Sequence, residues 1–175
     1  PVRIVLGVLA LWLAWLAVVQ ARILGINFLL SVLTLVWVAD IFAYFAGRAF
    51  GLRFTRNKLA PSISPGKSWE GVWGGLAGVL CLAVAWVAAD RYFQADVASF
   101  YTRLYSAGWW FLAIAVVFMV AMSVAGDLVE SLIKRSAGVK DSSGLLPGHG
   151  GVLDRVDALL PTLPLALMLT RLISV

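Results

Sequence analysis

The chain has 175 residues, of which 62% are hydrophobic and 13% are charged. Soluble domains contain roughly 45–50% apolar and 25% charged residues, so this composition excludes a soluble domain and predicts an integral membrane protein. The net charge of +5 needs no nucleic acid, because excess Lys and Arg in membrane proteins mostly reflects topology. The one cysteine, Cys81, excludes a disulfide within the chain.

Five stretches approach the roughly 20 apolar residues that a membrane-spanning helix needs. They cover about Ile4–Val19, Phe28–Ala46, Val72–Ala89, Trp109–Ala125 and Ala158–Leu172. The fourth is expected to continue as a helix through Arg135, and Pro161 and Pro164 predict a kink or an irregular start in the fifth. The 90–108 connection is expected to be a plain external loop. We therefore expect an all-α, polytopic bundle of about five transmembrane helices.

The basic residues predict how this bundle is oriented. Alternation of five spans places four of them on one side, namely Arg22, Arg91, Arg103 and Arg171. The other ten fall on the opposite side: Arg3, Arg48, Arg53, Arg56, Lys58, Lys67, Lys134, Arg135, Lys140 and Arg155. The positive-inside rule assigns the ten to the cytoplasm.

The stretch from Gly126 to Asp157 is the most polar part of the chain. It holds five of the nine acidic residues, four of the fourteen basic ones and the only histidine, His149. On a helix, Asp127, Glu130 and Lys134 share one face, and a loop rich in Gly and Ser follows them. Hard oxygen ligands, basic groups and a close-fitting loop suit Mg²⁺ bound to a polyphosphate. One His and one Cys are too few for a zinc site.

A second polar segment precedes the third span. Backbone N–H groups at the start of that helix would form an anion site together with the side chains of Ser62, Ser64, Lys67 and Ser68. The segment contains Gly-Lys-Ser but is not a Walker A loop, since its first glycine would fall at Pro61. A solvated basic loop is the simpler alternative. The glycines 74, 75 and 78 are expected to allow close helix packing.

Three stretches resemble the phosphatidate cytidylyltransferase family, also called CDP-diacylglycerol synthases. The longest reads Ser131-x-x-Lys134-Arg135, then Lys140-Asp141-x-x-Gly144-x-x-Pro147-x-His149-Gly150-Gly151-x-x-Asp154-Arg155-x-Asp157. The others read Trp37-x-x-Asp40-x-x-Ala43-Tyr44-x-x-Gly47-Arg48 and Ser64-Pro65-Gly66-Lys67-Ser68-Trp69-Glu70-Gly71. Family members are typically longer at the N-terminus, so residues 1–175 are expected to be one integral-membrane catalytic domain, the C-terminal part of a longer chain.

The resemblance implies transfer of a cytidylyl group from CTP to phosphatidate, giving CDP-diacylglycerol and pyrophosphate. Mg²⁺ is the implied cofactor, with a second cation as an option. Residue types then suggest the metal ligands: Asp127 and Asp154 first, with Glu130 and Asp157 as alternate ligands or as groups that hold the ligands in place. The basic groups Lys134, Arg135, Lys140 and Arg155 would clamp phosphates. Asp141 would orient Lys140 or hold ribose or cytosine, and His149 would donate to a phosphate or only shape the loop.

Several alternatives stay open at this point. Asp40 and Ser131 are candidate substrate-binding residues. Asp40 either lines the active-site cavity or joins helices through a protonated or hydrogen-bonded carboxyl. Glu70 either serves the site or complements a helix dipole. A CDP-archaeol synthase and a CTP-dependent polyprenol kinase are the nearest rivals; a proton- or cation-coupled transporter using Asp40, Asp127 and Glu130 is a more distant one. A structural membrane subunit leaves the paired carboxylates unexplained.

The expected partners are CTP, phosphatidate and the lipid bilayer, with a homodimer as an option and no nucleic acid. The expected location is the cytoplasmic (inner) membrane of a bacterium, with the active site facing the cytoplasm. Lipid would then enter sideways from the bilayer while CTP arrives from the cytoplasm.

Overall fold

The computed structural model describes residues 2–55, 57–145 and 150–173. Its helices are α1 (Val2–Leu24), α2 (Ile26–Phe50), α3 (Trp69–Tyr92), α4 (Phe100–Ser106), α5 (Trp109–Ser136), α6 (Leu153–Val156) and α7 (Leu159–Ile173). Within the described residues there is no strand, and an isolated bridge joins Ala60 and Ser64. The all-α prediction is therefore confirmed.

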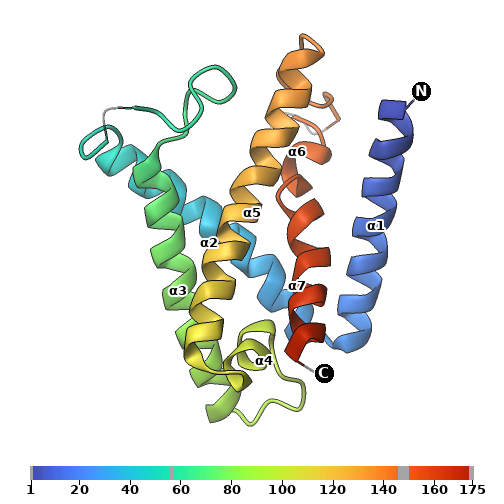
Figure 1. Ribbon diagram of the computed structural model, residues 1–175, viewed down its shortest axis with the longest axis vertical. Helices are drawn as coiled ribbons and strands as arrows, with labels where there is room; N and C mark the ends of the chain where they lie inside the picture. The colour runs from blue at the N-terminus through green and yellow to red at the C-terminus, as the bar shows by residue number, and fades with distance from the viewer. Residues whose placement is uncertain (1, 56, 146–149, 174–175) are drawn as a thin grey trace.

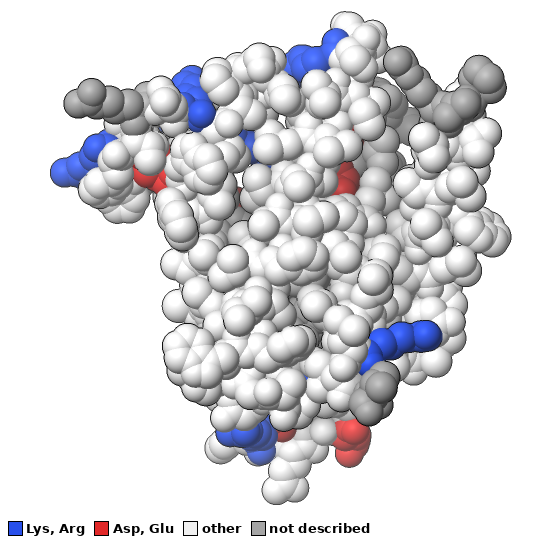
Figure 2. Space-filling view, in the orientation of Figure 1, with Lys and Arg blue, Asp and Glu red and all other residues white. Residues whose placement is uncertain are grey.

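Five helical stretches are long and apolar enough to cross a membrane. They are Ile4–Leu24, Ile26–Phe50, Trp69–Tyr92, Trp109–Ser136 and Leu153–Ile173. Each contains one of the five predicted spans. Most of their apolar side chains point outward, including Trp12, Trp15 and Trp110. On the face drawn in Figure 2, charged side chains lie toward the two ends, with a wide uncharged band between them. The protein is an integral membrane protein.

Helices α1, α3, α5 and α7 run roughly along the long axis, and α2 crosses them obliquely (Figure 1). The closest approach is between α2 and α3, where glycines remove side chains from the contact. A Cβ on Gly74 would lie 2.1 Å from Ala46 Cβ, and one on Gly75 would lie 2.8 Å from the Ala39 carbonyl oxygen. The predicted role of these glycines in helix packing is confirmed.

The connection between α3 and α5 is not the plain external loop that we predicted. It contains α4, whose Phe100, Tyr101 and Leu104 are completely buried. Asp90 holds this segment, because its carboxylate accepts hydrogen bonds from Ser99 N at 3.0 Å and from Thr102 Oγ1 at 2.6 Å. The prediction was wrong because it gave more weight to the mixed charge of this segment than to its short apolar face, which consists of residues at i, i+1 and i+4.

The predicted irregular start of the last span is confirmed. The one-turn helix α6 is separated from α7 by Asp157 and Ala158, and Pro161 lies in the first turn of α7, where a missing N–H costs little. Predicted continuation of the fourth span is also confirmed, since α5 runs to Ser136.

Both polar segments lie at one end of the molecule. The 51–68 segment, the C-terminal end of α5 and α6 are found there together with the N-terminus, whereas the α1–α2 turn and α4 lie at the other end (Figure 1). This arrangement confirms the predicted alternation of the spans. The side of the membrane that each end faces stays a prediction.

Candidate active site

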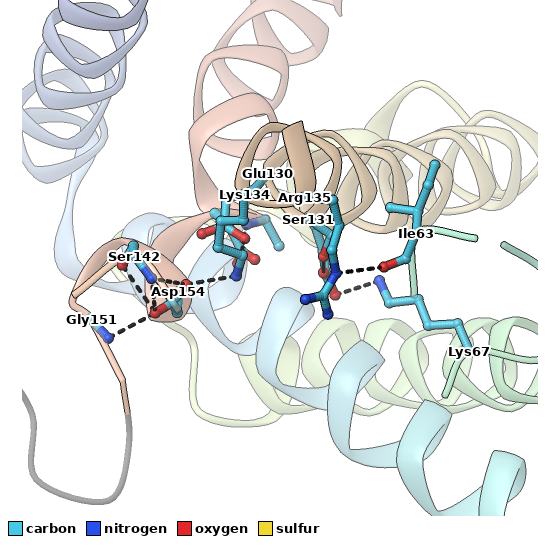
Figure 3. A network of polar contacts seen from close by, with 12 residues as sticks. Ile63, Lys67, Glu130, Ser131, Lys134, Arg135, Ser142, Gly151 and Asp154 are labelled. Carbon is cyan, nitrogen blue, oxygen red and sulfur yellow. Dashed lines mark hydrogen bonds and ion pairs between the residues drawn. The ribbon is translucent and has the colours of Figure 1, made fainter. Parts of the chain in front are cut away.

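Ionisable side chains form two neighbouring groups at this polar end (Figure 3). We call Lys134, Glu130 and Asp154 the Lys134 cluster, and Lys67, Asp127, Asp40 and Asp157 the Lys67 cluster. Each is centred on one lysine. Together they contain all four predicted metal ligands, two predicted substrate-binding residues and one predicted catalytic residue.

The Lys134 cluster joins α5 to α6. The Lys134 ammonium lies 2.5 Å from Glu130 Oε2, one helical turn earlier on α5, and 2.7 Å from Asp154 Oδ1. Side-chain exposure is 17% for Lys134, 8% for Glu130 and 10% for Asp154. Glu130 Oε1 is buried without a hydrogen-bond partner among the described residues. One ammonium thus serves two nearly buried carboxylates.

Asp154 also closes the loop that precedes it. Its Oδ2 accepts hydrogen bonds from Gly151 N at 2.7 Å and from Ser142 N and Oγ at 3.0 Å each. Tight packing of this loop depends on glycine: a Cβ on Gly151 would lie 1.9 Å from Ser142 Oγ, and Gly150 has a φ of +79°. Asp154 therefore holds the two arms of the loop together in addition to pairing with Lys134.

The Lys67 cluster joins the 51–68 segment to α5. Lys67 forms an ion pair with Asp127 Oδ2, and Ser131 Oγ donates to Asp127 Oδ1 at 3.3 Å. Asp40 and Asp157 interact electrostatically with both members of this pair. Asp157 also accepts a hydrogen bond from Ala158 N at 2.7 Å. Three carboxylates, from α2, α5 and the α6–α7 junction, therefore act on one ammonium, and that of Asp127 contacts it directly.

A cavity of about 410 Å³ opens beside this cluster, between α2, α3 and α5. Its polar lining includes Asp40, Tyr44, Arg48, Lys67 and Asp127, whereas Val72, Val120 and Val124 form apolar walls. Asp40 thus lines a cavity, as the functional interpretation requires. Tyr44 and Arg48 were missed as candidates, although their i, i+4, i+8 spacing with Asp40 places all three on one face of α2.

The 51–68 segment is fixed to the start of α3 by two side chains. Ser68 caps α3 by accepting a hydrogen bond from Gly71 N at 3.2 Å. Glu70 Oε1 accepts from Phe54 N at 3.1 Å and from both Thr55 N and Thr55 Oγ1 at 2.8 Å. Glu70 is therefore more than a charge at a helix start, because it ties the incoming segment to α3.

The remaining predicted residues divide by position. Arg135 lies at the rim, where its Nε donates a long hydrogen bond of 3.5 Å to the Ile63 carbonyl. Lys140 and Asp141 are exposed on the loop, and Ser62 and Ser64 do not line the cavity. Arg155 follows Asp154 on α6. His149 lies outside the described residues. The roles predicted for these side chains stay predictions.

Comparison with known proteins agrees with this arrangement. The sequence pattern of the cytidylyltransferase family matches residues 2–173. The chain is 51% identical over 140 residues to a phosphatidate cytidylyltransferase of Haemophilus influenzae, covering 80% of this chain and 44% of that protein. It is 46% identical over 164 residues to one of Pseudomonas aeruginosa, covering 93% of this chain and 55% of that protein. A Thermotoga maritima relative of the same name is 40% identical over 146 residues, covering 83% of this chain and 49% of that protein.

The chain thus spans about half the length of the curated relatives that it matches. The match nevertheless includes the polar segments of α2, the 51–68 segment, α5 and the loop that follows it. This chain belongs to the cytidylyltransferase family.

Proposed function

We propose that the protein containing this chain transfers the cytidylyl group of CTP to phosphatidate, giving CDP-diacylglycerol and pyrophosphate. The observation that carries the proposal is the meeting of the family's polar segments at one end of a bundle of spanning helices, where Lys67 and Lys134 face carboxylates beside a cavity. Relatives at 40–51% identity are named for this activity.

In the proposed reaction a phosphate oxygen of phosphatidate attacks the α-phosphorus of CTP. The new P–O bond forms as the bond to the bridging oxygen of the β-phosphate breaks, and pyrophosphate leaves with that oxygen. Phosphatidate is already an anion at neutral pH, so no general base is required. Transfers of this kind depend on positioning and on neutralising spread negative charge.

Basic side chains supply part of that neutralisation. Lys67 and Lys134 would contact substrate phosphates directly, with Arg135, Lys140 and Arg155 around them. Both lysines are held by carboxylates from other segments. These ion pairs fix where the ammonium groups stand before a substrate arrives, which reduces the ordering cost of binding.

The donor set fits the Mg²⁺ that the family resemblance implies. Among the described residues the two clusters offer only oxygen atoms as metal ligands, and a buried carboxylate oxygen of Glu130 has no hydrogen-bond partner there. The described residues contain no group of three or more His, Cys, Asp or Glu placed to hold a metal ion. Mg²⁺ usually binds through one or two carboxylates plus substrate phosphates, so its binding does not require a group of three protein ligands.

Asp127 and Asp154 would hold the ion, with Glu130 and Asp157 next to them and a second cation as an option. When bound, Mg²⁺ would neutralise charge on the phosphates of CTP. We further propose that the polar end faces the cytoplasm of a bacterium from its cytoplasmic membrane. The bacterial relatives and the excess of basic residues assigned to this end support that location.

The test is incorporation of labelled CTP into lipid by membranes that carry the full-length protein. Reactions contain phosphatidate with Mg²⁺ or EDTA, and compare wild type with Asp127→Asn and Asp154→Asn. The matched control is Asp96→Asn, an exposed acid at the opposite end. We expect Mg²⁺-dependent CDP-diacylglycerol that both site variants reduce by at least about 100-fold, equivalent to about 2.7 kcal/mol, and that the control leaves unchanged.

Because Asp154 also closes the loop, its variant needs a second measurement. Asp154→Asn is expected to increase protease cleavage between residues 137 and 152, whereas Asp127→Asn is expected to leave cleavage unchanged. Activity that survives both substitutions would refute the metal assignment and leave the reaction intact. Product formed only from an ether lipid or a polyprenol would refute phosphatidate as the substrate.

A further inference from the structure

The face of α2 that lines the cavity carries a cation, Arg48, that forms no ion pair with a carboxylate of the described residues. Asp40, Tyr44 and Arg48 follow one another at intervals of four residues, so they extend about 12 Å along the helix at 1.5 Å per residue. Asp40 marks the deep end, within the span, and Arg48 marks the shallow end, in the last turn of α2. Tyr44 lies between them.

Arg48 differs from Lys67 and Lys134 in having no carboxylate partner among the described residues. Its one contact there is a hydrogen bond of 2.9 Å from Nη1 to the Tyr44 hydroxyl oxygen. Because that oxygen accepts from Arg48, the phenolic proton remains available to a further acceptor. Guanidinium and phenol donors therefore meet at one edge of the cavity, and Lys67 lines the same cavity. Such a set of donors suits an anion with several oxygens.

The surroundings of this edge favour a lipid over a nucleotide. Apart from its polar groups, the cavity is walled by Ala39, Val72, Val120 and Val124. The same helix exposes Trp37, Ile41 and Phe45 next to this edge, all large and apolar. Large apolar side chains exposed on a membrane-spanning helix suit contact with acyl chains. A ligand bound at Arg48 can therefore keep its phosphate in the cavity and its acyl chains outside the bundle.

We propose that Arg48, Tyr44 and Lys67 bind the phosphomonoester headgroup of the lipid substrate, which leaves the Lys134 cluster for the nucleotide. This inference rests on the proposed function and divides its two substrates between two parts of the site. Lys67 stands between the parts, because it lines the cavity and pairs with Asp127.

A purely structural role for Arg48 makes a different prediction. A cation in the last turn of a helix is stabilised by the helix dipole, and a lysine there would serve equally well. Lysine does not reproduce the planar fork that binds two phosphate oxygens at once. Arg48→Lys therefore separates the two roles, since it keeps the charge and removes the bidentate geometry.

The experiment measures initial rates of the full-length protein in mixed micelles. One series varies the mole fraction of phosphatidate at saturating CTP, and a second series varies CTP at saturating phosphatidate. Losing a hydrogen bond to a charged group costs about 1.5–3 kcal/mol, so Arg48→Gln is expected to raise KM for phosphatidate about 10- to 150-fold. Arg48→Lys and Tyr44→Phe are each expected to raise it about 3- to 10-fold. KM for CTP stays within about twofold, and the control Arg53→Gln, an exposed residue outside the cavity, changes neither constant.

A rise in KM for CTP, or an unchanged KM for phosphatidate in Arg48→Gln, would overturn the inference even if wild type makes CDP-diacylglycerol. Native mass spectrometry of the purified protein tests the headgroup site independently of activity. It measures whether the protein retains phosphatidate in preference to phosphatidylcholine. If wild type retains phosphatidate through Arg48 but forms no product, the headgroup site stands and the proposed reaction fails. Equal retention by wild type and Arg48→Gln overturns the site. The melting temperature of Arg48→Lys shows whether folding is intact.

Discussion

Replacing Lys134 by methionine tests whether the Lys134 cluster holds α5, α6 and the loop together. Methionine keeps most of the side-chain volume and removes the ammonium that lies 2.5 Å from Glu130 and 2.7 Å from Asp154. Breaking a buried ion pair costs about 3–5 kcal/mol, because the remaining charge is left uncompensated. Here two carboxylates at 8% and 10% exposure lose their shared partner, while Lys134 itself is 17% exposed. We therefore expect a loss at the lower limit, about 3 kcal/mol.

At about 2–4 °C per kcal/mol for a chain of this size, the melting temperature of Lys134→Met in detergent should fall by about 6–12 °C. Lys140→Met is the matched control, since Lys140 is exposed on the loop and should shift Tm by less than about 2 °C. The double variant Lys134→Met with Glu130→Gln should recover part of the loss, because one of the two orphaned charges is gone. A single variant that melts like wild type would refute a structural role for the cluster, whatever its activity.

Two further substitutions test how the site is supported. Glu70→Ala removes the acceptor of three hydrogen bonds from Phe54 and Thr55. We expect a stability loss of about 1–3 kcal/mol and a raised KM for substrate because Lys67 is displaced, and Glu70→Gln should restore most of both properties. An unchanged Tm and KM in Glu70→Ala would contradict this. Gly126→Ala would place a Cβ 2.8 Å from Pro161 Cγ and 3.0 Å from the Asp157 carbonyl oxygen, so we expect a loss of about 1–3 kcal/mol by thermal unfolding. Its control, Gly7→Ala, meets nothing within 4 Å and should be neutral or stabilising by up to about 1 kcal/mol; equal stability of the two variants would count against close α5–α7 packing.

The arrangement of the spans could be predicted from the sequence because each span is a continuous apolar run bounded by charge. The continuation of α5 could be predicted too, since Asp127, Glu130 and Lys134 share one helix face beyond the apolar run. The burial of α4 could not be predicted from the sequence, because the apolar face of this helix is short and the residues on either side of it resemble a loop. Its burial depends on Asp90, which is fixed by partners from two segments, including Asn27 more than sixty residues away.

The partners within the site were harder to predict than its members. Asp127 and Asp154 were both predicted as metal ligands, but the lysine that each one pairs with was not predicted: the structure pairs Asp127 with Lys67 and Asp154 with Lys134. The Lys67–Asp127 pair joins residues sixty positions apart, and which lysine reaches which carboxylate depends on the tilt of α2 and the path of the 51–68 segment. Neither is encoded in local spacing. Tyr44 and Arg48 were missed for a related reason, since only the packing of α3 and α5 turns that face of α2 into a cavity wall.

The charges of the two clusters bear on how substrates bind. With every group ionised, the Lys67 cluster carries three carboxylates and one ammonium, a net charge of −2, and the Lys134 cluster carries two carboxylates and one ammonium, a net charge of −1. In that fully ionised state the three excess negative charges would repel both a nucleoside triphosphate and a lipid phosphate, most strongly at the low dielectric of the membrane border. The lysines alone cannot reverse this, since each is already paired. Cations that enter with the substrates, such as the proposed Mg²⁺, would offset this charge if the carboxylates bind the cations while Lys67 and Lys134 contact the phosphates.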